Sequence, residues 1–340
     1  MTTPPSSTNR ASRRGWLTGL LSLILSVGGL LFLLSRLDFA AVGEALQTVD
    51  YGLFIVSTVM SALLQLMFPW RWWVLLNYRV SLWRSTTASF AGDFVNAITP
   101  LRMGEVARAA LIHRSEGVSW GAALSTIVLS QLLDLLALAF MGVLLLFIAP
   151  LPPELTQAGA VIGLLTLAAM LVLLVMALRA EALHAWLMPL INRLAGEQRG
   201  GRVLGVVRGA LQGLQTLRNP LQLLYAVAIS MALWLLIGLS GWVLLVGMLP
   251  APGLELALAV SFAGGIGRLL PALPGSIGTL DFAVVFSLTT LGVPDDIAIA
   301  FTLLLRLRYV LVTAITGVIG LLGEGVSLGR VREMVSESRP

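Results

Sequence analysis

Long runs of residues without a charge are the feature that most constrains this chain. Uncharged runs occupy residues 15–35, 51–70, 155–178 and 219–254. About 20 apolar residues in a helix suffice to cross the roughly 30 Å hydrocarbon core of a bilayer. The sequence therefore predicts an all-α polytopic membrane protein, and any charge inside its spans needs a specific explanation.

The composition agrees with this fold class. Of the residues, 57% are hydrophobic and 11% are charged, and the mean hydropathy is +0.92. A soluble domain carries about 25% charged residues. The chain contains no cysteine, which excludes disulfides, thiolate catalysis and cysteine-ligated metals.

The placement of the arginines predicts the topology. Six spans are expected at about 16–34, 51–69, 119–148, 159–178, 220–248 and 297–322. If the N-terminus is inside, the four cytoplasmic stretches hold 18 of the 22 arginines. This asymmetry is what the positive-inside rule predicts, so both termini are expected in the cytoplasm. The first run is longer than the 7–15 residues of a signal peptide core, so it is expected to be retained.

The domain organisation follows from these spans. Residues 1–14 are expected to form a disordered cytoplasmic tail, 15–325 the transmembrane domain, and 326–340 a second cytoplasmic tail. The stretch 69–84 interleaves tryptophan with arginine, which is typical of a helix lying in the membrane interface.

Two apolar regions do not fit a plain span. Residues 86–111 contain Pro100 and are flanked by arginines on the cytoplasmic side, which favours a re-entrant segment over an amphipathic surface helix. In 255–296, charges and a turn rich in Pro and Gly divide the region into short runs, which predicts a hairpin of two short helices entering from outside. Whether 255–272 and 277–292 span fully or re-enter is left open. Paired discontinuous segments of this kind point to a transporter's midplane site.

Several charges are expected deep in the bilayer, with arginine in excess. They are Arg102, Arg268, Arg306 and Arg308 against Glu105, Asp134 and Asp281. If these charges served only to pair with one another, the numbers of positive and negative groups would tend to be equal. An excess of guanidinium groups instead suits an anionic ligand such as a phosphate. Arg306 and Arg308 should point about 200° apart on their helix, so at most one is expected to face a given cavity squarely.

Signals of an enzyme are few. A Walker A motif needs lysine, which this chain lacks, and the only histidines, His113 and His184, lie in arginine-bearing loops without a metalloprotease motif. We therefore expect no catalytic residues, no metal, no cofactor and no nucleic-acid partner. A membrane transferase with an Asp or Glu base is a remaining alternative.

Two motifs carry a family resemblance. The first runs Asn96-x-x-x-Pro100-x-Arg102-x-Gly104-Glu105-x-x-Arg108, and the second runs Pro271-x-x-Pro274-Gly275-x-x-Gly278-x-x-Asp281, with arginine in the following span. Together they resemble the flippase-like integral-membrane region of bacterial lysylphosphatidylglycerol synthases, over about residues 15–325. The resemblance implies a helical domain that moves a lipid between leaflets. It does not imply lysyl transfer, which belongs to a separate soluble domain. Asp281 stands where the family usually has Glu, and Ser276 where a second Gly is common.

The leading hypothesis is a flippase or transporter for an anionic polar-headed lipid, such as a phospholipid or polyprenyl phosphate. The alternative is a non-transporting scaffold or accessory subunit of a lipid- or glycan-modifying enzyme. The lipid, the direction, the energy coupling and a homo-oligomeric state are left open. The expected substrate-binding residues are Asn96, Pro100, Arg102, Glu105, Arg108, Asp134, Arg268, Pro274, Gly275, Asp281, Arg306 and Arg308.

Overall fold

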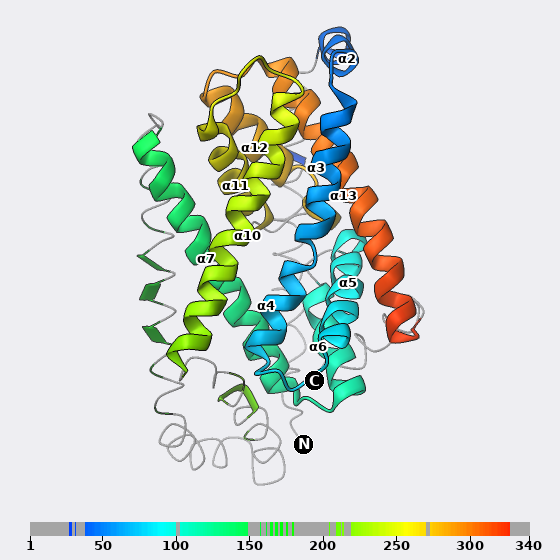
Figure 1. Ribbon diagram of the computed structural model, residues 1–340, viewed down its shortest axis with the longest axis vertical. Coiled ribbons are helices and arrows are strands. Elements are labelled where there is room, and N and C mark those ends of the chain that lie inside the picture. Colours follow the sequence, from blue (N-terminus) through cyan, green and yellow to red (C-terminus); the bar gives the residue numbers. More distant parts are fainter. Residues whose placement is uncertain are drawn as a thin grey trace, which may run out of the picture.

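The computed structural model describes residues 38–99, 103–148, 219–269 and 273–326, with single positions within 27–31, 157–179 and 204–213. The regular elements in these ranges are helices (Figure 1). Four are long and apolar enough to cross a membrane: Tyr51–Leu75, Trp120–Leu145, Pro220–Val246 and Asp295–Glu324. They coincide with four of the six predicted spans. The predicted spans 16–34 and 159–178, the tail 1–14 and residues 327–340 lie outside the described residues.

The span 51–75 is a broken helix. It consists of α3 (Tyr51–Leu64) and α4 (Met67–Leu75), separated by a turn at Gln65 and Leu66. It follows α2 (Phe39–Gln47) at the upper end of the bundle in Figure 1. Asp50 starts α3 because its Oδ1 accepts hydrogen bonds from the backbone N–H groups of Gly52 and Leu53, at 2.8 and 3.2 Å.

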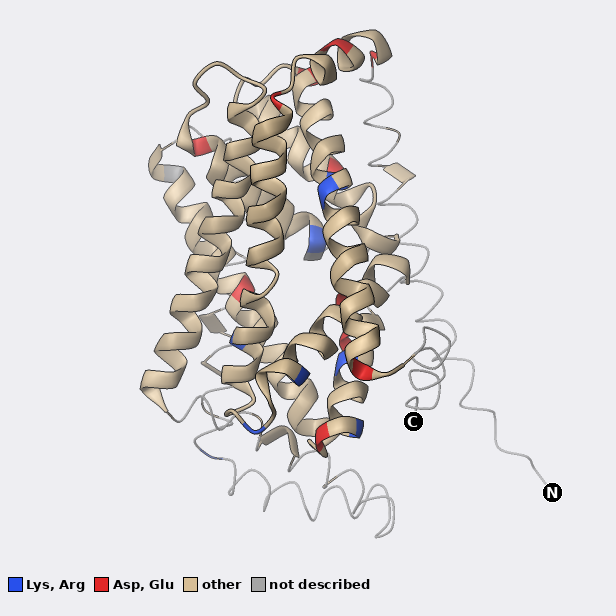
Figure 2. Cartoon of the chain, turned by 45° about the vertical axis from the view of Figure 1, so that its right-hand side comes forward, with Lys and Arg blue, Asp and Glu red and all other residues tan. Residues whose placement is uncertain are grey.

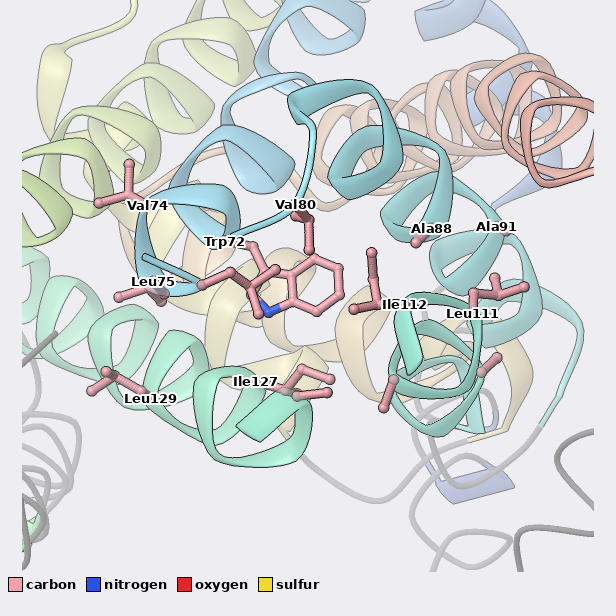
Figure 3. Packing of buried hydrophobic residues seen from close by; sticks show 14 of the residues in the cluster. Trp72, Val74, Leu75, Val80, Ala88, Ala91, Leu111, Ile112, Ile127 and Leu129 are labelled. Atoms are coloured by element: carbon pink, nitrogen blue, oxygen red, sulfur yellow. The ribbon is translucent and has the colours of Figure 1, made fainter. Parts of the chain in front are cut away.

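The prediction of an interfacial helix over residues 69–84 is wrong. Arg71 is 2% exposed and Trp72 is fully buried, in the core between α4, α6 (Met103–Glu116) and α7 (Trp120–Ile148). Figure 3 shows the Trp72 ring between Val80, Ile112 and Ile127. The indole N–H donates to Thr126 Oγ1 at 3.0 Å, so this tryptophan finds its polar partner inside the protein instead of at the membrane surface.

Helices α5 (Leu82–Ile98) and α6 (Met103–Glu116) form the first hairpin. They pack closely at Gly104, where a Cβ atom would clash with the carbonyl oxygen of Gly92 and the side chain of Asn96. Most of α5 between Ser85 and Val95 is buried, which excludes the alternative of an amphipathic surface helix. The segment predicted to be re-entrant thus folds as a helical hairpin packed inside the bundle, and its re-entry from the cytoplasmic side stays a prediction.

The second hairpin joins α11 (Leu254–Leu269) to α12 (Thr279–Thr290) through the short 3₁₀ turn η2 (Pro274–Ser276). At 1.5 Å per residue, 16 and 12 residues correspond to about 24 and 18 Å. Neither helix is long enough to cross a hydrocarbon core of about 30 Å alone.

The long helix α13 (Asp295–Glu324) packs against α5 of the first hairpin and α12 of the second, while α10 (Pro220–Val246) packs against α11. Helix α13 packs along α5, and a Cβ atom at Gly320 would clash with the backbone N–H of Ala91. Close backbone approach through small residues is how membrane helices associate. The first hairpin is thereby fixed against α13, and its tip contacts η2 of the second.

Charged residues occur inside the bundle as well as at its ends (Figure 2). At the end that carries α2, the charged residues that the structure describes are all acidic: Asp38, Glu44, Asp50, Glu255, Asp295 and Asp296. The opposite end carries both signs, including Arg84, whose guanidinium lies 3.6 Å from the Glu324 carboxylate.

Candidate functional site

A cavity of about 460 Å³ lies in the interior of the bundle, where the two hairpins meet. Small-molecule sites typically enclose about 300–1,000 Å³. Its wall includes residues from α3, α4, α7, α10 and α13 in addition to both hairpins. The two discontinuous segments expected from the sequence therefore line one shared space.

Eight of the twelve expected site residues line this cavity. They are Asn96, Glu105, Arg108, Asp134, Arg268, Gly275, Arg306 and Arg308. Asp281 lies behind the wall and contacts it through Arg306, while Pro274 sits in the η2 turn and does not line the cavity. Pro100 and Arg102 lie outside the described residues.

In the first motif, Asn96 and Gly104 shape the hairpin. The Asn96 side-chain oxygen accepts a hydrogen bond from the Gly104 backbone N–H at 2.7 Å, and so caps the start of α6 from the neighbouring helix. One turn further, Arg108 pairs with Glu105 at 3.2 Å and lies over the Trp72 ring, 4.4 Å from its centroid. The Arg108 side chain is thus fixed by an ion pair and a cation–π contact.

In the second motif, Asp281 and Arg306 fasten the turn. Asp281 Oδ2 accepts from the backbone N–H of Gly278 at 2.9 Å, and its Oδ1 accepts from Arg306 Nη2 at 2.5 Å. Arg306 Nη1 also donates to the carbonyl oxygen of Gly275. The turn needs such support because Gly275, Ser276 and Gly278 all have positive φ, of 66°, 55° and 88°.

Asp134 has a partner that the sequence did not indicate. Arg71 forms two parallel hydrogen bonds with its carboxylate, at 2.5 and 2.9 Å, and the Trp234 indole N–H donates to the same carboxylate at 2.9 Å. Arg71 also donates to Ser230 Oγ. This bidentate geometry is the strongest form of an arginine–carboxylate contact.

Arg308 is held differently from the arginines in these ion pairs. It is 7% exposed, and its Nη1 donates to Ser57 Oγ at 2.5 Å and to the backbone and side-chain oxygens of Ser240 at 3.4 Å. Within the described part of the chain, no carboxylate forms an ion pair with Arg308. Arg268 is exposed at the rim of the cavity, with its guanidinium 6.0 Å from the Tyr309 ring centroid.

Arg306 and Arg308 both line the cavity, and the expectation that at most one would face it squarely stays a prediction. Their guanidinium groups do reach different partners, Arg306 to the η2 turn and Arg308 to α3 and α10. The long flexible stem of arginine lets both heads reach one space from different sides of the helix.

The sequence reasoning also missed two residues on the wall next to α5. Gln65 lies at the break between α3 and α4, and its Nε2 donates to Asp93 Oδ2 at 3.2 Å. Both residues line the cavity. The sequence did contain a signal for this pair, because Gln65 is a polar amide at the end of an apolar span and Asp93 is a carboxylate in the segment expected to re-enter.

The charges of the wall do not cancel. Five arginines line the cavity, against three carboxylates, Asp93, Glu105 and Asp134. Adding Asp281, which pairs with Arg306, leaves one positive charge in excess among the described residues. Among these same residues, no group of three or more metal-ligating side chains comes together.

Comparison with known proteins places the chain in a family. A family model described as the lysylphosphatidylglycerol synthase TM region matches residues 19–317. No individual curated protein matches the chain. Since the match covers the four described spans almost completely, together with both hairpins and every expected site residue, the chain is a member of the lysylphosphatidylglycerol synthase TM region family.

Proposed function

We propose that this protein is a lipid flippase, which binds the polar headgroup of an anionic lipid in the central cavity and moves the lipid between leaflets. The observation that carries the proposal is the excess of positive charge in a cavity inside an apolar bundle. A buried cation in hydrocarbon is costly, by about 2.5–3.5 kcal/mol on insertion scales, and is usually retained for a function. Membership of a family of membrane regions from a lipid-modifying synthase supports a role with lipids.

The two hairpins support transport over static binding. Each reaches the cavity with an interrupted backbone, and irregular backbone at membrane depth survives only inside protein or beside a wet cavity. Transporter sites are commonly built from such discontinuous helices near the midplane. We place the protein in the bacterial inner membrane because its two motifs resemble those of bacterial lysylphosphatidylglycerol synthases. The arginine asymmetry supports an orientation with both termini in the cytoplasm.

Translocation in proteoliposomes tests this function. Purified protein is reconstituted with trace fluorescent phosphatidylglycerol or phosphatidylcholine, and loss of fluorescence to a membrane-impermeant reductant reports lipid reaching the outer leaflet. We expect faster exchange of the anionic lipid than of the zwitterionic one, relative to protein-free vesicles. A Glu116→Gln variant, changed in a partly exposed ion pair outside the cavity, serves as the matched control and should behave like the wild type.

A non-transporting scaffold is the second candidate. Arg71, Arg108 and Arg306 are already paired with protein carboxylates, as expected where arginines serve structure. Wild-type protein that moves neither lipid, with or without an ion gradient, would favour the scaffold over the flippase.

A further inference from the structure

The arginines of the cavity differ in whether their guanidinium groups are already paired with a carboxylate. Arg71, Arg108 and Arg306 each pair with a carboxylate, at 2.5, 3.2 and 2.5 Å. An anion approaching any of them would compete with a fixed negative charge that is already in contact. Arg308 has only neutral oxygens as hydrogen-bond partners within the described part of the chain.

The contacts of Arg308 fix one edge of its guanidinium group. Ser57 Oγ donates its proton to the Ser240 carbonyl oxygen at 2.7 Å, so a lone pair of that hydroxyl accepts from Arg308 Nη1. A guanidinium group has five N–H donors. The hydrogen bonds that the structure places on Arg308 all use Nη1, and Nε and Nη2 have no partner among the described residues. The Nε–Nη2 edge is the planar fork that matches two phosphate oxygens.

The surroundings of Arg308 increase its attraction for an anion. The residue is only 7% exposed, and charge interactions at such a buried position are screened much less than at the surface. Arg268 lines the same cavity and adds a second positive charge to its wall. On the same helix, Thr313 also lines the cavity and is buried.

A row of polar side chains on α3 leads to this point. Ser57 and Ser61 are spaced by four residues and therefore lie on one face of α3, and Gln65 follows four residues later in the turn at its end. This row of Ser57, Ser61 and Gln65 is named here the α3 stripe. Ser61 and Gln65 line the cavity, and Ser57 holds Arg308. The opposite face carries apolar side chains such as Val59 and Leu63, which are 53% and 61% exposed.

We propose that Arg308, positioned by Ser57 and Ser240, is the phosphate-binding subsite of the cavity, and that the α3 stripe is the polar wall along which the phosphate group reaches it. This inference rests on the proposed function only for the source of the phosphate, a lipid headgroup. The three arginines that pair with carboxylates, Arg71, Arg108 and Arg306, stabilise the wall of the cavity, and Arg308 contacts the phosphate.

Protection of a single cysteine tests the subsite without requiring transport. The chain has no cysteine of its own, so Ser61→Cys introduces one thiol on the α3 stripe while Arg308 stays intact. The protein is placed in nanodiscs of phosphatidylcholine, or of phosphatidylcholine with phosphatidylglycerol, and treated with a charged, water-soluble thiol reagent. Both lipids carry a phosphate, but the choline cation of phosphatidylcholine neutralises it within the headgroup, whereas the phosphate of phosphatidylglycerol has no such counter-charge. We therefore expect reaction in phosphatidylcholine and a reaction about tenfold slower with phosphatidylglycerol, because its bound headgroup covers the thiol. Val59→Cys, on the lipid-facing side, should react slowly in both.

Replacing Arg308 then identifies the group that binds. In the Ser61→Cys background, Arg308→Gln should abolish the protection by phosphatidylglycerol, and Arg308→Lys should restore only part of it because lysine lacks the fork. Inorganic phosphate added to phosphatidylcholine nanodiscs distinguishes the source. Protection by inorganic phosphate alone would support the subsite and assign it to a soluble phosphate compound, contrary to the flippase proposal.

Two results would overturn the inference. One is equal reactivity of the Ser61→Cys thiol in both lipids together with no effect of inorganic phosphate. The other is protection that persists unchanged in Arg308→Gln. If Arg308→Gln does not fold, Arg308→Lys, which keeps the buried charge, takes its place, and protection as strong as in the Ser61→Cys parent would overturn the inference. The flippase proposal fails separately, if this thiol is protected by phosphatidylglycerol but wild-type protein moves no lipid in proteoliposomes.

Discussion

The Arg71–Asp134 pair allows the structural role of a cavity arginine to be measured. The Arg71 side chain is 3% exposed and that of Asp134 is 20% exposed, and two hydrogen bonds join them. Replacing Asp134 with Leu would leave a buried guanidinium without its counter-charge. Breaking a buried pair in this way costs about 3–5 kcal/mol. Because Asp134 is partly hydrated and Ser230 still accepts from Arg71, we expect the lower value, about 3 kcal/mol of unfolding free energy.

The double substitution gives the sharper test. Replacing a buried pair with apolar residues of similar volume is often neutral or stabilising, so Arg71→Met with Asp134→Leu should lose less than about 1 kcal/mol. The single Arg71→Met variant should lose about 2 kcal/mol, less than Asp134→Leu because the stranded carboxylate can reach water. The four proteins form a double-mutant cycle with a coupling of several kcal/mol.

Denaturant unfolding in mixed micelles, followed by tryptophan fluorescence, measures these differences. Glu116→Gln is the control, because its pair with Arg84 is long at 3.8 Å, with side chains 36% and 26% exposed, and should contribute less than about 1 kcal/mol. Losses that simply add in the double variant would refute the reasoning. They would mean that the two residues act independently and that Arg71 is not held by Asp134.

Three further predictions concern the turn, the first hairpin and the topology. Ser276→Gly should raise the unfolding free energy by up to about 1 kcal/mol, since Ser276 has φ 55°, and a loss of stability would contradict the described turn. Gly104→Val should lose at least about 2 kcal/mol, because the added side chain meets the carbonyl of Gly92, and unchanged thermal stability would contradict the close packing. An impermeant thiol reagent applied to intact cells should label Glu44→Cys and not Ser115→Cys, both exposed positions, and the reverse pattern would overturn the predicted orientation.

The long spans could be predicted from the sequence because bilayer thickness sets their length. The spans expected at 119–148, 220–248 and 297–322 correspond to α7, α10 and α13 within a few residues. Capping residues mark some of these ends, as at Asn219, whose side chain accepts from the N–H groups of Leu221 and Gln222. The two interrupted segments were also predictable, because charges and Pro/Gly turns leave runs too short to cross.

The pairing of charges could not be predicted in the same way. Arg71 and Asp134 are 63 positions apart, and nothing local in the sequence links them. The arginine stands beside Trp72 in a pattern typical of a membrane interface, and only tertiary packing buries it. Likewise, the sequence indicated Arg306 as a ligand for phosphate, whereas the structure commits its N–H groups to Asp281 and the η2 turn.

The proposed availability of Arg308 for an anion also depends on tertiary structure. Ser57 and Ser240 are small polar residues in otherwise apolar helices and carry no motif. Their role becomes apparent only when α3, α10 and α13 bring them to Arg308. The sequence therefore indicated the deep arginines, but it did not indicate which of them pair with carboxylates and which is proposed to bind an anion.

A high-resolution experimental structure in nanodiscs containing phosphatidylglycerol tests the central claim most directly. We predict density for a lipid phosphate inside the cavity, within hydrogen-bond distance of Arg308, with the Arg71–Asp134 and Arg306–Asp281 pairs still formed. Headgroup density confined to the outer surface of the bundle, with the space beside Arg308 closed by protein side chains, would contradict it.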